Sequence, residues 1–479
     1  MIKQLSKLEP TVLTIFGATG DLSANYLLPA LWRMALDKLL PQNFRLVAVG
    51  RRDFDTAGYL DFISKKSRHL KLLGREARKK IFKNLVYYRG DLDNPSSFSG
   101  LADLLQDPKS SNYACFNRLY YFATAPEFFP KITSILNNAG LLKACAGHNR
   151  QVRVLIEKPF GSDLKTAKVL NRTLLKYFSE EQIYRIDHYQ GKETVQNLMV
   201  VRFANSLFEP LWNKNFISHI EVSVLYDDRV GERAYFDQAG ILRDAVQNHA
   251  LQMLAMILMD EPRELLTKYI CDEKVKILEA LRPFKKYGAK DSVLRGQYLG
   301  YTKEVGRTSH SETYAALKAF VDSPRWKGVP IYIRAGLALR KKIIEISIHF
   351  KDLPRCLFRG CAANVMTFRI QPDESVRLRI NNKVPGFGIN LHQADWEFSY
   401  QAAFQNRIAG AYERLILDFI EGDQRLFIRS DEIEAAWEFI DSVRDTWSGL
   451  PLLKYQPGSR GPKEADKFVA KDGHEWWTK

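Results

Sequence analysis

Short apolar runs alternate with amphipathic stretches over the first third of the chain. The runs Thr11–Phe16, Arg45–Gly50, Leu119–Ala123 and Val152–Glu157 are each a few residues long and mostly apolar, as buried strands are. Between the first two runs, leucine, methionine and alanine recur at helical spacing from Leu22 to Ala35. Strand, helix and strand in this order predict a parallel sheet covered by helices on both faces.

The second half of the chain follows a different period. Apolar and polar residues alternate over Ile220–Val224, Ile344–Phe350 and Val376–Ile380, which predicts an antiparallel sheet with one polar face. Helical patterns over 240–259 and 431–443 interrupt these strands. The expected fold class is α/β followed by α+β, the second domain being larger and built on a mostly antiparallel sheet with helices. The polar stretch from Pro457 to Lys479 predicts an extended, partly mobile tail.

Composition and charge narrow the class of protein. The chain has 479 residues, 46% hydrophobic and 26% charged, which is globular composition with length for two or three domains. Its net charge of +16 favours anionic partners such as dinucleotides, phosphorylated metabolites or nucleic acid. Five scattered cysteines argue against a disulfide framework, and Cys356 with Cys361 lacks the spacing of a zinc site. No apolar run suits a signal peptide or a membrane span, so we expect a cytoplasmic protein.

A glycine turn follows the first predicted strand. In the string FGATGDLS, Gly17 and Gly20 lie between a strand and a helix, where backbone N–H groups and a helix N-terminus can bind a pyrophosphate. The spacing GxxGxxS is weaker evidence than GxGxxG, and such turns are often purely structural. The position after the first strand favours a cofactor site.

The residues after the second predicted strand distinguish between nicotinamide cofactors. An NAD site has a carboxylate here for the ribose hydroxyls, whereas this chain has Arg51 and Arg52. Two guanidinium groups suit a 2′-phosphate. Asp53 follows directly, and its negative charge would oppose that phosphate. The alternative interpretation is that Arg51 and Arg52 are simply solvated surface residues. We favour NADP.

Two segments in the middle of the chain concentrate polar chemistry. Lys158 follows a predicted strand and precedes Pro159, so a cis bond in a tight turn would point its ammonium into a cleft at the carboxyl end of the sheet. The string DHYQGK, from Asp187 to Lys192, places an acid, an imidazole, a phenol and an ammonium together, which suits the oxygens of a sugar phosphate. The first feature is also typical of an ordinary turn at the end of a strand, and the residues of the second also occur singly as exposed polar side chains without a function.

A third segment, Arg243–His249, continues into a predicted buried helix. Asp244 and His249 are five residues apart, so they do not share one face of an α-helix. A lone histidine in such a helix is usually a satisfied core residue, and it acts as a general base only if a carboxylate holds it. Asp187 is the candidate carboxylate.

Taken together, these strings resemble the glucose-6-phosphate dehydrogenase family. The matching strings are FGATGDL, EKPFG, RIDHYQGKE, QNLMVVRFAN, YFDQAGILRDAVQNH and GSRGPKEAD, in the family's order across nearly the whole chain. The resemblance implies a Rossmann-like NADP-binding domain over residues 1–186. It also implies a β+α domain over residues 187–479 that binds the substrate and forms a homodimer or homotetramer, with no membrane or nucleic-acid partner.

The implied reaction is the oxidation of D-glucose 6-phosphate at C1 by NADP, which gives 6-phospho-D-glucono-1,5-lactone and NADPH. This is the first step of the oxidative pentose phosphate pathway. By resemblance, His249 is the base at the C1 hydroxyl, Asp187 orients it, and Lys192 belongs to the same catalytic group. A histidine base has its pKa near the working pH, and this chemistry requires no metal.

The resemblance also assigns binding roles. The implied substrate-binding residues are Lys158, His188, Tyr189, Lys192, Asp227, Asp244 and Lys342. The implied cofactor-binding residues are Gly17, Thr19, Gly20, Asp21, Leu22, Arg51 and Lys158.

Two positions depart from the family pattern. The lysine that usually follows GDL is replaced by Ala24, and the lysine of the family's GKxL segment is replaced by Leu337. Because one charge-assisted hydrogen bond contributes roughly 1.5–3 kcal/mol, each loss would weaken substrate binding by about one to two orders of magnitude. We expect an active enzyme with a raised KM, or one with another sugar phosphate as substrate or with compensating arginines such as Arg340.

Other functions stay open at this point. A regulatory, non-catalytic family member would explain Ala24 and Leu337, although the intact His249, Asp187 and Lys192 argue against it. A nucleic-acid-binding protein would explain the net charge, but the basic runs 65–68 and 75–83 are more typical of solvated helix faces. The string GSRGPKEAD with Trp476 and Trp477 resembles the eukaryotic branch, in which a second, structural NADP binds near the C-terminus, here beside Arg460.

Overall fold

The computed structural model describes residues 9–72, 82–106, 117–143, 151–231, 235–284, 291–404 and 407–478. It divides into two compact units. The first comprises Met1–Gly161, Lys165–Gly191 and Ala409–Ser430. The second comprises Ser162–Leu164, Lys192–Ile408 and Asp431–Lys479. The sequence analysis expected a single boundary after residue 186, whereas the chain returns to the first unit at residue 409.

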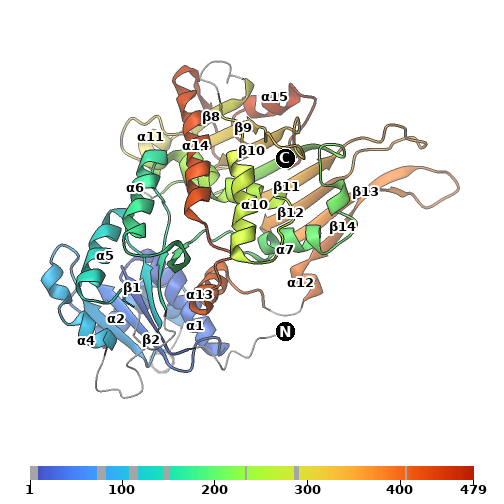
Figure 1. Ribbon diagram of the computed structural model, residues 1–479. Helices are drawn as coiled ribbons and strands as arrows, with labels where there is room; N and C mark the ends of the chain where they lie inside the picture. Colours follow the sequence, from blue (N-terminus) through green and yellow to red (C-terminus); the bar gives the residue numbers. More distant parts are fainter. Residues whose placement is uncertain are drawn as a thin grey trace. The chain divides into compact units, whose positions relative to one another are not determined.

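The first unit is built on a parallel sheet (Figure 1). Among the described residues the strand order is β3-β2-β1-β4-β5-β6, and every neighbouring pair is parallel. The strands are β1 (Thr11–Phe16), β2 (Phe44–Gly50), β3 (Leu85–Arg89), β4 (Asn117–Phe122), β5 (Val152–Ile156) and β6 (Ile183–Arg185). Every residue of β1, β4, β5 and β6 is buried, as expected for a sheet covered on both faces. The four strands predicted from apolar runs are confirmed as β1, β2, β4 and β5.

Helices join and cover these strands. They are η2 (Ser23–Leu27), α1 (Leu28–Leu36), α2 (Thr56–Lys66), η3 (Leu70–Leu72), η4 (Pro95–Phe98), α4 (Leu101–Gln106), η5 (Pro126–Phe128), α5 (Phe129–Asn138), α6 (Leu164–Leu175), η6 (Glu180–Gln182) and α13 (Ala411–Glu421). Helix α13 packs against α1. Phe419 of α13 and Phe427 lie edge-on to Tyr184 of β6, with ring centroids 4.9 and 4.8 Å apart. This aromatic cluster explains why residues 409–430 belong to the first unit.

The second unit contains a nine-stranded sheet among its described residues, in the order β14-β13-β12-β11-β7-β10-β9-β8-β15. Pairs β7–β10 and β8–β15 are parallel and the others are antiparallel. The strands are β7 (Ile217–Leu225), β8 (Val293–Tyr298), β9 (Tyr314–Ala319), β10 (Ile331–Gly336), β11 (Ile343–Phe350), β12 (Val365–Gln371), β13 (Ser375–Lys383), β14 (Leu391–Ser399) and β15 (Leu452–Tyr455). The mostly antiparallel sheet expected from period-two patterns is confirmed.

The helical pattern predicted over 240–259 is confirmed, and so is the one over 431–443. The helices of the second unit follow in chain order. They are α7 (Glu193–Phe203), η7 (Glu209–Leu211), α8 (Phe236–Ile241), η8 (Leu242–Ala250), α9 (Leu251–Leu258), α10 (Thr267–Glu279), α11 (Tyr301–Glu304), α12 (Tyr400–Ala403), α14 (Ser430–Asp445), η10 (Trp447–Gly449) and α15 (Glu464–Ala470). No helix in the described part of the chain is long and apolar enough to cross a membrane.

The C-terminal residues include a helix and a buried tryptophan, so the segment expected to be an extended, partly mobile tail is not extended throughout. Residues 464–470 are helix α15, and the Trp476 side chain is buried and donates its indole N–H to Ala465 O at 2.9 Å. The backbone N–H of Trp477 donates to Glu221 of β7. The tryptophans supply enough apolar surface to hold this polar segment on the sheet.

The cysteines also differ from expectation in one respect. Cys356 and Cys361 form a disulfide between β11 and β12, although the sequence analysis expected no disulfide framework. Cys271 is a buried free thiol, and Cys115 and Cys145 lie outside the described residues. A single local bridge closes one short loop and leaves the fold dependent on its apolar core.

Candidate active site

The glycine turn after β1 has a backbone conformation that requires glycine. Gly17 has φ +84°, and a Cβ there would overlap the backbone carbonyl of Ala123. The Gly17 and Ala18 N–H groups donate to Val49 O of β2, at 3.2 and 3.0 Å, and the Gly20 N–H donates to Gly17 O. Only glycine fits such a position. The chain then enters a helix whose first turns, η2, are π-helical.

Lys66 belongs to this turn, although the sequence analysis took residues 65–68 as a solvated helix face. Its Nζ donates to Thr19 O at 3.1 Å and lies 3.1 Å from Asp21 Oδ1. Lys66 is the last residue of α2, so the fold turns its side chain back onto the loop between β1 and η2. The periodicity of α2 alone carries no signal for this contact, because the contact joins residues 47 positions apart.

Two arginines follow β2 as expected, and the carboxylate beside them is neutralised. Arg51 and Arg52 are exposed, and the Arg52 guanidinium lies over the Phe62 ring, 4.8 Å from its centroid. Asp53 pairs with Arg89 at the end of β3, with 3.1 Å between Oδ2 and Nη1. The negative charge of Asp53, which would oppose a 2′-phosphate, is therefore offset by Arg89. The local sequence around Asp53 does not show this pairing.

Lys158 lies at the carboxyl end of β5, as predicted, and its bond to Pro159 is cis. The preceding carboxylate, Glu157, accepts a hydrogen bond from Tyr121 Oη at 2.6 Å. Burial raises the pKa of Glu157 to about 7, although Tyr121, Lys158 and Tyr412 each act to lower it. Sequence analysis missed Tyr121 and Tyr412, which come from β4 and α13.

The segment after β6 presents three of the predicted residues. Asp187 is buried, and its Oδ1 accepts the backbone N–H of Tyr189 at 2.9 Å. The His188 ring is half-buried and lies parallel to the Tyr412 ring at a centroid distance of 6.4 Å. Tyr189 is buried, with its ring 4.5 Å from that of His188. The turn therefore fixes the Asp187 carboxylate through backbone geometry.

Lys192 stands at the N-terminus of α7, where it meets a carboxylate that the sequence analysis did not identify. Its Nζ lies 3.6 Å from Glu374 Oε1, and Glu374 Oε2 accepts from the Thr194 N–H and hydroxyl at 3.0 and 3.1 Å. Anions are stabilised at helix N-termini. The position that suits a phosphate thus holds an internal carboxylate.

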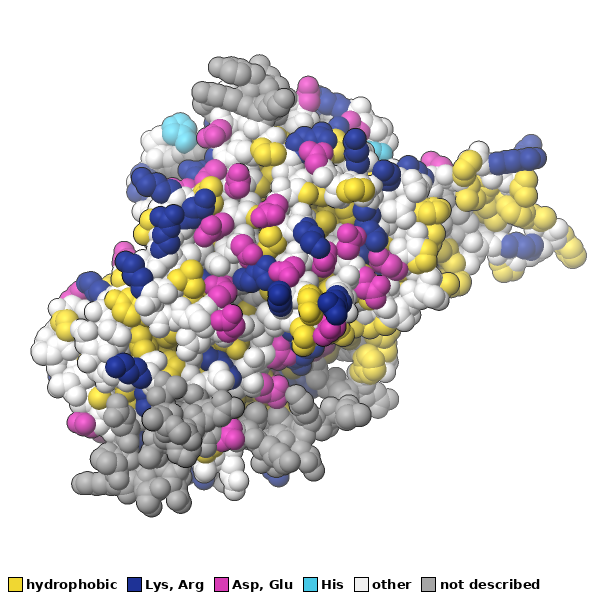
Figure 2. All heavy atoms as spheres, viewed as in Figure 1, with side chains coloured by type: hydrophobic (Ala, Val, Ile, Leu, Met, Phe, Trp, Pro, Cys, Tyr) yellow, Lys and Arg dark blue, Asp and Glu magenta, His cyan; other side chains and the backbone are white. Residues whose placement is uncertain are grey.

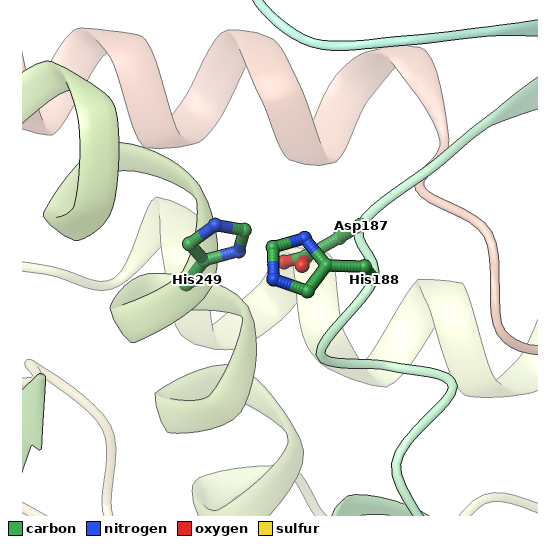
Figure 3. Close-up of side chains that lie close together, drawn as sticks. All are labelled: Asp187, His188 and His249. Atoms are coloured by element: carbon green, nitrogen blue, oxygen red, sulfur yellow. The ribbon is translucent and has the colours of Figure 1, made fainter. Parts of the chain in front are cut away.

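The backbone winding brings Asp244 and His249 closer to one helix face than an α-helix would. They lie on η8, a π-helical segment, in which the N–H of residue i+5 bonds to the carbonyl of residue i. Residues five apart are therefore separated by little more than one turn. His249 is buried and Asp244 is half-buried, and Tyr235 donates to Asp244 Oδ1 at 3.3 Å. Figure 3 draws His249 of η8 with Asp187 and His188 of the segment after β6.

The other predicted substrate residues lie elsewhere in the second unit. Asp227 is exposed in the loop after β7, and Lys342 is half-buried just before β11. Leu337 and Ala24, at the positions where the family has lysines, are buried with 1% and 0% exposure. Both positions are part of the apolar core, and neither brings a charge to the site.

The first unit has a parallel sheet, a glycine turn after its first strand and arginines after its second, as dinucleotide-binding domains do. The second unit carries a buried histidine on a π-helical segment, which suits a general base. These features indicate a dinucleotide-dependent oxidoreductase. Residues 14–197 match the family model "Glucose-6-phosphate dehydrogenase, NAD binding domain", and residues 199–477 match "Glucose-6-phosphate dehydrogenase, C-terminal domain". The chain belongs to the glucose-6-phosphate dehydrogenase family, which confirms the resemblance of its motifs.

Individual relatives agree with the family match. The glucose-6-phosphate 1-dehydrogenase of Chlamydia pneumoniae is 38% identical, over 98% of this chain and 96% of that protein. That of Bacillus subtilis is also 38% identical, over 98% of each. Among solved structures, the Mycobacterium avium enzyme is 31% identical with a TM-score of 0.84, covering 98% of this chain and 99% of that one. A glucose-6-phosphate dehydrogenase in complex with glucose 6-phosphate is 30% identical with a TM-score of 0.89, covering 99% and 100%.

Proposed function

We propose that this chain oxidises D-glucose 6-phosphate at C1 with NADP, giving 6-phospho-D-glucono-1,5-lactone and NADPH. The observation that carries the proposal is the buried His249 of the π-helical segment η8, in a chain that matches this family over nearly its whole length. The reaction would be the first step of the oxidative pentose phosphate pathway.

The residues of the first unit fit NADP. Gly17 lets the end of β1 pass close to the backbone of Ala123, and the N-terminus of the following helix adds a partial positive charge for a pyrophosphate. Arg51 and Arg52 supply cations for a 2′-phosphate, and Arg89 neutralises Asp53. When bound, NADP accepts the hydride from C1. We assign Thr19, Gly20, Asp21, Leu22 and Lys158 to the same cofactor site.

In the proposed mechanism His249 removes the proton of the C1 hydroxyl, which increases the electron density that expels the hydride. Asp187 pairs with the imidazole, orients it and stabilises its protonated form. His188, Tyr189 and Lys192 bind the sugar phosphate, for which Lys192 exchanges Glu374 for the substrate. Asp244, Asp227, Lys158 and Lys342 contact the sugar and its phosphate.

The decisive experiment measures NADPH formation at 340 nm over a wide range of glucose 6-phosphate concentrations. We expect saturable turnover that His249→Asn reduces by at least about 10²-fold, the lower end of a general-base contribution. His310→Asn, which changes an exposed histidine of the second unit, should keep wild-type turnover. A folded chain that binds NADP but does not turn over would overturn the proposal and favour a regulatory member or another sugar phosphate.

The same substrate titration tests the effect of Ala24 and Leu337, which stand where the family has lysines. We expect a raised KM for glucose 6-phosphate, because Ala24 and Leu337 contribute no charge, each missing lysine weakening binding by about one to two orders of magnitude. A low KM would mean that other cations, such as Arg340, compensate.

We propose further that the chain forms a homodimer through the β13–β14 hairpin. Hydrophobic side chains gather on this hairpin (Figure 2), among them Val384, Phe387, Ile389, Trp396 and Phe398, all at least 36% exposed. An apolar edge of this kind usually marks a protein interface. The cytoplasmic location expected from the sequence stays a prediction, which cell fractionation would test.

A second, structural NADP near the C-terminus, beside Arg460, is a separate proposal. The Arg334 guanidinium lies 4.2 Å from the Trp476 ring centroid, and that of Arg379 lies 4.5 Å from the Trp477 ring centroid, so cations and aromatic rings meet in this segment. Equilibrium dialysis that found one NADP per chain would contradict this proposal.

A further inference from the structure

Three metal-ligand side chains meet on the polar face of the sheet in the second unit. His219 and Glu221 are two residues apart on β7, so they project from the same face. His349 of β11 is paired with His219 in the antiparallel register. The three residues therefore form a cluster that two neighbouring strands fix, apart from the residues of the proposed active site.

The ligand atoms of this cluster are close together and buried. One ligand atom from each of His219, Glu221 and His349 lies within 4.8 Å of the other two. Glu221 Oε1 is 3.2 Å from His349 Nε2 and 3.7 Å from His219 Nε2. Neither Nε2 atom makes a hydrogen bond of acceptable geometry with the described residues. Two buried ring nitrogens thus lie near one carboxylate oxygen, at distances that suit a shared charge interaction or a shared ligand.

Neighbouring groups hold the cluster in this arrangement. Ser218 Oγ contacts His219 Nδ1 at 3.2 Å, so the other ring nitrogen remains available to a ligand. The backbone N–H of Trp477 lies 3.1 Å from both oxygens of Glu221. The ring of His474 covers that of His219 at a centroid distance of 3.9 Å.

The nearest cation does not occupy the cluster. Arg334 donates to Ser223 Oγ at 2.9 Å and to Thr478 O at 2.7 Å, and stacks on Trp476. Its guanidinium is therefore directed to other partners. On the same face Glu345 pairs with Arg369 at 2.6 Å, so that second buried carboxylate has its own counter-charge. Among the described residues, Glu221 has the two imidazoles within 3.7 Å, and the charge of Arg334 also acts on it.

We propose that His219, Glu221 and His349 bind a Zn²⁺ ion, with a fourth position for water or for His474. The two imidazole rings are stacked with their centroids 4.0 Å apart, so they turn on binding until both Nε2 atoms point to the ion. Two imidazole nitrogens and one carboxylate oxygen form a ligand set that zinc prefers. Because the ligands come from β7 and β11, and because Glu221 also holds Trp477, the ion would fasten the C-terminal segment to the sheet. This role is structural and independent of the proposed function.

The test measures zinc retention by the whole protein. Chelator-treated wild-type protein is incubated with one equivalent of Zn²⁺ and desalted, and metal per chain is determined by mass spectrometry. We expect one Zn²⁺ per chain in the wild type and a rise in its melting temperature, and loss of both in His349→Gln. His310→Gln, at an exposed histidine, and His249→Asn should retain the ion. Failure of the wild type to retain zinc, or equal retention by His349→Gln, would overturn the proposal.

A second measurement needs no variant. Co²⁺ bound at this cluster should give the visible absorption of a four-coordinate nitrogen and oxygen site. A thiolate charge-transfer band would instead place the metal on cysteine, and absence of a four-coordinate spectrum would exclude the geometry. Either result would refute the proposal even if every substitution on the sheet impaired folding.

Discussion

Glu312 is a buried carboxylate of the second unit. It is 4% exposed and accepts the Leu242 N–H at 3.0 Å. Burial raises its pKa to about 7, although that hydrogen bond and the charges of Arg243 and Arg295 lower it. The group therefore stays protonated in the folded state at pH values where the unfolded chain has lost the proton.

This linkage predicts a pH-dependent loss of stability. Between the unfolded pKa of 4.5 and the folded value of about 7, the folded state binds more protons, so the free energy of unfolding falls as the pH rises. Glu312→Gln retains an acceptor for Leu242 and cannot ionise. At pH 8 it should be more stable than the wild type by up to about 3 kcal/mol, and near pH 4.5 the two should converge. Denaturant unfolding at several pH values measures this, with Glu261→Gln, at an exposed carboxylate, as control. If the free energies of unfolding of wild type and Glu312→Gln change with pH in parallel, the prediction is wrong.

Arg51 carries a prediction of cofactor choice, which rests on the proposed NADP site. Arg51→Ala removes a cation that suits a 2′-phosphate, so the KM for NADP should rise by about ten- to a hundredfold, while the KM for NAD should change little. Initial rates with each cofactor give both constants. Arg68→Ala, at an exposed arginine outside the turn, should leave the ratio of the KM for NADP to the KM for NAD unchanged. If Arg51→Ala also leaves this ratio unchanged, Arg51 does not belong to the cofactor site.

At the scale of elements, the π-helical segment η8 is the feature that the sequence pattern could not show. Periodicity predicted a helix over 240–259 correctly, but the α-helical spacing separated Asp244 from His249. The i to i+5 hydrogen bonds of η8 turn the backbone less per residue than an α-helix does, so Asp244 and His249 come closer to one face. That choice depends on packing against the sheet, which a local pattern does not report.

Gly240, which precedes η8, provides a test of this element. It has φ +69°, and a Cβ would overlap the Glu312 carboxylate that caps Leu242. Gly240→Ala should destabilise the chain by roughly 1–3 kcal/mol and lower turnover, since η8 carries Asp244 and His249. Gly300→Ala is the matched control, with φ +91° and open space around the Cβ. If both variants lose equal stability and neither loses turnover, the Glu312 contact has no role.

At the scale of the whole molecule, the hairpin β13–β14 predicts an oligomer. Trp396 is 62% exposed on β14, and a charge there would disfavour burial at an interface. Trp396→Glu should shift the chain from dimer to monomer in light scattering after gel filtration. Leu207→Glu, at a residue 71% exposed but outside the hairpin, should remain dimeric. A monomeric wild type would contradict the proposed interface.

The sequence by itself determined the parallel and antiparallel sheets, the order of the domains and the family, because apolar periodicity and contiguous motifs are local properties. The glycine turn at Gly17 and the cluster after Asp187 belong to this part. Only the tertiary structure decided the contacts of Lys66 with the glycine turn, of Arg89 with Asp53, and of Glu374 with Lys192. It also placed residues 464–478 on the polar face of the sheet, over His219 and Glu221. These pairs join residues far apart in the chain, and their partners are set by packing and charge in three dimensions, which no local spacing encodes.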